Sequence, residues 1–85
     1  MKRVEVTYRQ LDQVLRSLGF TCQVVMKDGE ARRYAHTQSG AIILLPAYPE
    51  EDKVLEYHLL MVRVTLENFG IADPTTFDAK LQKAG

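Results

Sequence analysis

Only one cysteine occurs among the 85 residues, so no intramolecular disulfide framework can stabilise the chain. A lone thiol is typical of proteins that fold in a reducing compartment, and we expect a cytoplasmic location. No residue close to Cys22 in the sequence would activate it as a nucleophile. We therefore expect Cys22 to act as a small buried apolar side chain.

An excess of either charge is also absent, because eleven basic residues balance eleven acidic ones. This balance removes the simplest argument for nucleic-acid binding, so any such site must be a local patch. No apolar run is long enough to span a membrane, and no signal-peptide pattern follows the first residues. Because no cysteine, histidine and acidic residues cluster at metal-ligand spacing, we predict neither a metal nor another cofactor.

The length predicts a single domain over residues 1–85. Thr7 and Gln10 form a capping-box pattern, and a stripe of leucine and valine follows them. Gly19 is suited to the left-handed residue that ends a helix. These signals predict a first helix over residues 8–18.

A strand with period-two alternation begins at Phe20, and Asp28-Gly29 is typical of a two-residue hairpin turn. Such a turn would pair Met26 with Ala31 and Lys27 with Glu30. In that register, three alternate side chains of the second strand point away from the face that carries Phe20 and Val24. These three residues are Arg32, Tyr34 and His36.

A second turn is predicted at residues 38–40, and a short apolar strand over residues 41–45 follows and ends at Pro46. The acidic segment 49–52 is suited to the start of a second helix, which should run to about Asn68. The apolar stripe expected on this helix comprises Val54, Leu55, His58, Met61, Val62, Thr65, Leu66 and Phe69.

Asp73 followed by Pro74 predicts the start of a short terminal helix, with Phe77 and Leu81 as its apolar positions. The predicted fold is therefore α+β, with the order α-β-β-β-α and a short C-terminal helix. We expect a three-stranded antiparallel sheet with the helices on one face. This is the layout of double-stranded-RNA-binding domains, although topology alone does not assign a function.

Several short motifs occur in the order and spacing of one protein family. They are LRSLGF ending at Phe20, Tyr34-Ala35-His36 between Gly29 and Gly40, the apolar strand to Pro46, and LENFGI ending at Ile71 with the later Phe77. From Thr7 to Phe77 the chain resembles the HicA/YcfA toxins of bacteria. The resemblance implies an endoribonuclease that cleaves messenger RNA without a metal and is inhibited by an antitoxin.

The position that matches the family's catalytic histidine holds Ala31. A methyl group can neither take nor give a proton, and Glu30 adds a negative charge where phosphate would approach. Tyr48 stands where the family often has a second histidine. We therefore expect a binding module for RNA or for an antitoxin-like protein, with no catalytic residue.

Lys27, Arg32, Tyr34 and His36 are the predicted RNA-binding residues, because cations bind phosphates and a ring can stack on a base. A solvated sheet face explains the same residues equally well. The predicted register turns Arg33 toward the helices, where it would cover apolar surface.

An active ribonuclease is the alternative, with His36 as the acid-base group and Arg32 holding a phosphate. A solvated strand histidine is the commoner situation. His58 lies within the apolar stripe of the second helix, where a buried histidine with a hydrogen-bond partner is more common than a ligand.

A second alternative is a structural protein that forms homo-oligomers. Tyr57, Leu60 and Val64 fall on the far side of the second helix and make it apolar on more than one face. They would form an interface between two copies, unless the terminal helix covers them.

Overall fold

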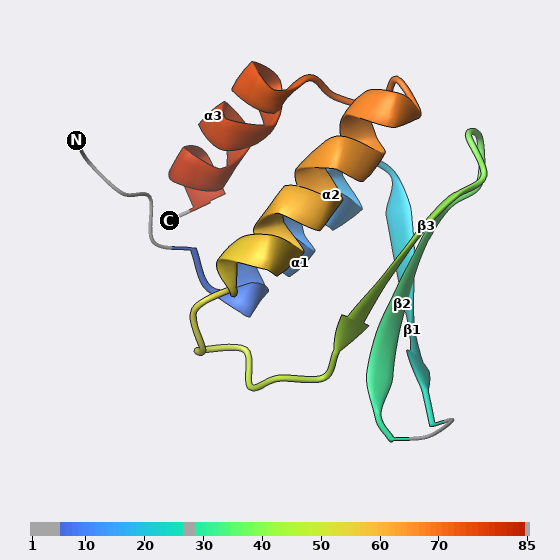
Figure 1. Cartoon of the computed structure of the whole chain (residues 1–85), viewed down its shortest axis with the longest axis vertical. Helices are drawn as coiled ribbons and strands as arrows, with labels where there is room; N and C mark the ends of the chain where they lie inside the picture. The colour runs from blue at the N-terminus through green and yellow to red at the C-terminus, as the bar shows by residue number, and fades with distance from the viewer. Residues whose placement is uncertain (1–5, 27–28, 85) are drawn as a thin grey trace.

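The computed structural model describes residues 6–26 and 29–84 and has the predicted α+β architecture. The elements follow the order α1 (Tyr8–Ser17), β1 (Phe20–Val25), β2 (Ala31–His36), β3 (Ala41–Pro46), α2 (Glu56–Asn68) and α3 (Pro74–Ala84). The three strands form one antiparallel sheet in the order β1-β2-β3. All three helices lie on the same side of this sheet, and the other side of the sheet is uncovered (Figure 1).

The helices form two layers over the sheet. α1 packs on β1 and α2 packs on β3, while α3 contacts both helices from the side away from the strands (Figure 1). One apolar cluster fills the space between the layers, and α3 contributes Phe77 and Leu81 to it. None of the helices in the described part of the chain is long and apolar enough to cross a membrane.

The signals read from the sequence for α1 are confirmed. The Thr7 side chain accepts a hydrogen bond from the Gln10 amide, and the Gln10 side chain accepts one from the Thr7 amide. The residue after the C-cap of α1 is Gly19, whose φ of 99° lies in the left-handed region that favours glycine. The capping box and this glycine therefore fix both ends of α1.

The predicted hairpin register between β1 and β2 is wrong by one residue. Ala31 pairs with Val25 instead of Met26, and Tyr34 pairs with Cys22. The connection is therefore longer than the two-residue turn predicted at Asp28-Gly29, of which Asp28 lies outside the described residues. A slip of one residue turns every side chain of a strand to the opposite face.

Burial explains why this register is favoured. The row Cys22, Tyr34 and Ile43 faces the helices, and both Tyr34 and Ile43 are buried. A two-residue turn would place the tyrosine ring in solvent and lose its burial, which is worth about 1.5–3 kcal/mol for a side chain of this size. We infer that the free energy gained by burying the Tyr34 ring is larger than the free energy that a tight turn at Asp28-Gly29 would contribute.

The start predicted for α2 is also wrong, because the helix begins at Glu56 and segment 49–52 forms a turn. Backbone carbonyls of this turn bond to the first amides of α1: Tyr8 donates to Asp52 and Arg9 to Glu50, each at 3.0 Å. These carbonyls satisfy amides that a helix start leaves without intrahelical partners. The segment therefore provides hydrogen-bond acceptors for the start of α1 and is not part of α2.

α3 begins as predicted, since the Asp73 carboxylate accepts a hydrogen bond from the Thr76 amide at 2.7 Å.

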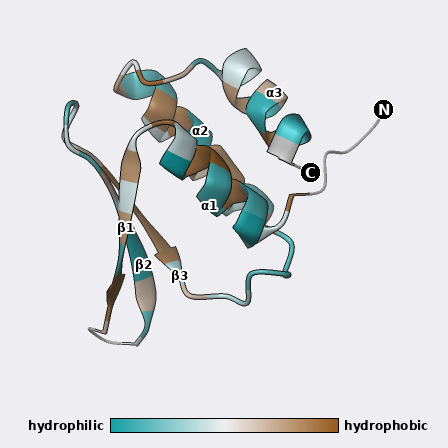
Figure 2. Ribbon diagram, turned by 180° about the vertical axis from the view of Figure 1, so that it is seen from behind, coloured by the Kyte–Doolittle hydropathy of each residue, from teal (hydrophilic) through white to brown (hydrophobic). Residues whose placement is uncertain are grey.

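β3 also agrees with the prediction. Ala41, Ile43 and Leu45 alternate as buried residues with exposed ones. Figure 2 shows hydrophobic colouring along most of this strand.

Candidate functional site

The three side chains predicted to form an outward strip on β2 face the helices instead. Tyr34 is 1% exposed, and its hydroxyl donates a 2.7 Å hydrogen bond to Asp12 of α1. Arg32 and His36 share the face of Tyr34, because they lie two residues before and after it on the same strand. The predicted orientation is therefore wrong, and Tyr34 is not available to stack on a base.

Asp12 of α1 accepts two hydrogen bonds, and the one from Tyr34 connects the helix to β2. Besides the Tyr34 hydroxyl, it accepts a 2.9 Å hydrogen bond from Nε of Arg16, one helical turn further along. Burial and the hydrogen bond to Asp12 raise the pKa of Tyr34, so the hydroxyl keeps the proton that it donates. The spacing of Asp12 and Arg16 indicates an ion pair on the helix. The hydrogen bond from Tyr34 to Asp12 could not be predicted in the same way, because it depends on the register that turns Tyr34 toward α1.

Arg32 and His36 lie near opposite ends of β2. They lie four residues apart on one strand, which separates their backbones by roughly 13 Å. Arg32 is half-buried in the row of Val24 and Leu45, at the opposite end of the strand from His36. Lys27, the fourth residue predicted to bind RNA, lies outside the described residues. The RNA-binding role of the four residues remains a prediction, without the continuous outward surface that it assumed.

His36 is held by the turn that follows it. Its Nδ1 accepts a hydrogen bond from the Ser39 amide at 3.3 Å and lies 2.8 Å from the Ser39 hydroxyl. Its ring packs on Phe20 with centroids 5.1 Å apart, and its Nε2 points toward Gly19. A shallow hollow of about 400 Å³ borders this histidine. Since Nδ1 serves as an acceptor here, Nε2 is the nitrogen that carries the proton in the neutral ring.

Ala31 opens β2 and pairs with Val25 and Pro46 on the face away from the helices. Its methyl group stands where the HicA/YcfA resemblance expects a histidine, and no described histidine approaches it, because His36 lies at the far end of the strand on the other face. Among the described residues, no imidazole therefore takes the place of the missing histidine at this position.

His58 is buried, as predicted for a histidine in the core-facing stripe of α2. Its Nδ1 lies 3.0 Å from the hydroxyl of Tyr8, which also accepts a 3.4 Å hydrogen bond from the Leu55 amide. The rings of Tyr48 and Tyr57 complete an aromatic cluster, with centroids 6.0 and 4.2 Å from that of His58. The sequence did not predict this cluster, because its members come from three separate segments.

We expect the stability of the fold to decrease in mild acid because of His58. Burial lowers the pKa of His58 below its ordinary value of 6.5, so the unfolded chain takes up a proton at a higher pH than the folded chain. The histidine's contribution is complete above that ordinary value and is lost as the pH falls through it toward the lower folded value. Urea unfolding at about pH 8 and about pH 5.5 measures the difference.

His58→Gln is the variant for this measurement, and His36→Gln is its control on the sheet. The pH-dependent loss should shrink in His58→Gln and persist in His36→Gln. An equal loss in wild type and His58→Gln would contradict the assignment to His58.

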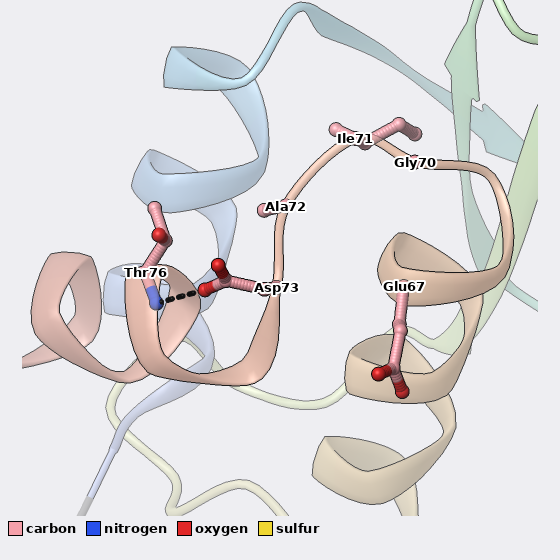
Figure 3. Close-up of a pocket in the computed structure, with 6 residues that line it drawn as sticks. All are labelled: Glu67, Gly70, Ile71, Ala72, Asp73 and Thr76. Atoms are coloured by element: carbon pink, nitrogen blue, oxygen red, sulfur yellow. Dashed lines mark hydrogen bonds between the residues drawn. The ribbon is translucent and has the colours of Figure 1, made fainter.

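A second hollow of about 400 Å³ lies beside the connection between α2 and α3 (Figure 3). Its lining carries two carboxylates, Glu67 and Asp73, and the hydrogen bond that Asp73 accepts from the Thr76 amide lowers the pKa of Asp73. The Asp73 carboxylate therefore caps the start of α3. Within residues 6–26 and 29–84, no group of three or more histidine, cysteine, aspartate or glutamate residues is placed to hold a metal ion.

Three of the described arginines form ion pairs with carboxylates. Arg9 pairs with Glu50 and Glu51, and Arg63 of α2 pairs with Asp78 of α3 at 2.7 Å. Arg16 pairs with Asp12, as described above. Each pair offsets the positive charge of its arginine, so Arg9, Arg16 and Arg63 add little to the electrostatic argument for RNA.

The outer face of α2 carries exposed apolar side chains that the other helices leave uncovered. Tyr57, Leu60 and Val64 are 64%, 56% and 43% exposed, and Met61 extends the same surface. Of the two alternatives left open by the sequence, coverage by the terminal helix is excluded, because these residues are exposed and α3 packs on α1 and on another side of α2. These four residues are called the α2 surface below.

Comparisons with family models, with curated proteins and with solved structures find no match for this chain.

Proposed function

We propose that this chain is a non-catalytic protein-binding module whose α2 surface pairs with the same surface of a second copy. The observation that supports this most directly is the exposure of Tyr57, Leu60 and Val64 on one side of a helix whose other side is buried. A helix that is apolar on several sides gains stability when a partner covers the exposed side.

The spacing within the α2 surface fits a symmetric pair. If two copies of α2 lie antiparallel around a two-fold axis between residues 60 and 61, Tyr57 of one copy meets Val64 of the other, and Leu60 meets Met61. An interface of this kind uses the same patch on both chains. The formal net charge of zero adds no overall repulsion between copies.

The acidic residues of α2 do not oppose this arrangement. In the same antiparallel pairing, Glu56 falls opposite Thr65, and the position opposite Glu67 lies before the start of α2, so no carboxylate of α2 faces another directly. Like charges placed directly opposite each other would disfavour the pair. Their separation supports self-association.

Loss of the HicA/YcfA nuclease chemistry is part of this proposal. Ala31 provides no proton-transfer group, and the ring of His36 packs on Phe20 at the opposite end of β2 from Arg32. An antitoxin-like protein is a further partner that the resemblance suggests for the module. RNA receives less support, because Tyr34 is buried and ion pairs involve Arg9, Arg16 and Arg63.

We expect the wild-type chain to form a dimer at micromolar concentration and Leu60→Glu to be monomeric. Each copy loses the burial of one leucine, worth about 1.5–3 kcal/mol, so the dissociation constant should rise at least about a hundredfold. Light scattering measures the mass, and circular dichroism checks that the variant is folded. Gln13→Glu, at an exposed position of α1, is the matched control and should remain dimeric. A monomeric wild type would refute self-association.

A further inference from the structure

The sheet face that points away from the helices is a second uncovered surface. The three strands each place alternate residues on it, and no helix lies on that side (Figure 1). Ile42 and Leu44 are its largest apolar side chains, and Leu44 is 55% exposed. The other members are Thr21, Gln23, Val25, Ala31, Arg33, Ala35 and Pro46.

Arg33 is the one charged residue among these members. The prediction that Arg33 points toward the helices is wrong, because the observed register turns Tyr34 inward and Arg33 outward. It lies in the middle strand between Gln23 of β1 and Leu44 of β3. Among the described residues, none of the carboxylates forms a salt bridge with it.

We propose that this face binds an apolar segment of another protein that carries one carboxylate opposite Arg33. The small side chains Ala31 and Ala35 flank Arg33 on its own strand and leave room for a partner to approach the guanidinium closely. A guanidinium binds a carboxylate through two parallel hydrogen bonds, and the neighbouring Leu44 together with the apolar segment of the partner would limit the access of water to the pair. This charge complementarity defines the chemistry of the partner.

The same charge argues against other occupants. A second copy stacked face to face about the centre of the sheet would bring Arg33 against Arg33, which is repulsive. RNA binding relies on several cations along the phosphate backbone, and this face has one. The face is separated from the α2 surface by the sheet itself, so the two surfaces can be occupied together and the proposal stands without self-association.

A library of random peptides displayed on phage is the probe for this face. We expect selection on the wild-type chain to enrich apolar peptides with one aspartate or glutamate. Selection on Arg33→Glu should instead enrich apolar peptides with one lysine or arginine. An enriched acidic peptide, made synthetically, should bind Arg33→Glu at least about thirtyfold more weakly than wild type, as expected for loss of a desolvated charge pair.

Three variants locate the binding. Leu44→Glu should abolish it, Arg33→Gln should weaken it even if Arg33→Glu folds poorly, and Leu60→Glu on α2 should leave it unchanged. The proposal is overturned if no peptide is enriched, if the enriched peptides lack an acidic residue, or if their affinity is insensitive to Arg33. A wild-type dimer that dissociates in Leu44→Glu and persists in Leu60→Glu would also overturn it, by showing that a second copy covers this face.

Discussion

Tyr34→Ala should lower the free energy of unfolding by about 3–5 kcal/mol, the usual cost of removing a buried aromatic ring. The ring is 1% exposed and packs in the apolar core between the sheet and the helices. Its removal leaves a cavity and also removes the hydrogen bond to Asp12. Urea unfolding followed by circular dichroism measures the change.

Two further variants separate the contributions at this strand. Tyr34→Phe keeps the ring, leaves Asp12 without that donor, and should cost about 1–3 kcal/mol. Arg33→Ala, on the outward face of the same strand, should change stability by about 0.5 kcal/mol or less. If Arg33→Ala strongly lowered the free energy of unfolding and Tyr34→Ala did not, the register of the β1-β2 hairpin described above would be incorrect.

Phe77→Ala should have a similarly large effect, about 3–5 kcal/mol. Phe77 is completely buried and joins α3 to the cluster formed by the sheet and the other two helices. Leu81, one turn further along, is also a buried apolar residue of α3. Without the phenyl ring, α3 retains little apolar contact, so we expect its amides to exchange hydrogen faster as well as the whole chain to be less stable.

Thr75→Ala is the control for α3, because Thr75 is exposed and lies in the same helix. It should change stability by about 0.5 kcal/mol or less. A Phe77→Ala variant with wild-type unfolding and wild-type exchange in α3 would show that the terminal helix is not part of the core.

Local signals in the sequence predicted the order of the elements because each acts within a few residues. The capping box at Thr7 and Gln10 and the Asp73 cap each involve neighbours in the chain. Buried and exposed residues alternate along β3 because one face of the strand packs against the helices. The fold class therefore followed from the sequence.

The candidate site was harder to predict because it depended on register. The pair Asp28-Gly29 favours a tight turn locally, but Tyr34 and Ile43 gain more by facing the helices. That comparison needs the positions of α1 and α2, which no short window of sequence contains. The partnership of Tyr8 with His58 was missed for the same reason, since it joins the start of α1 to α2.

The turn at residues 50–52 has a consequence for the order in which the protein folds. Its carbonyls receive the first amides of α1, and Val54 donates a hydrogen bond to Val6 at 2.7 Å. All three strands lie between these partners in the chain. During synthesis, α1 can therefore begin to coil early, but its first turn gains these partners only after the sheet has been made. Such contacts between distant parts of the chain slow folding, so we expect the start of α1 to be among the last parts of the structure to become fixed.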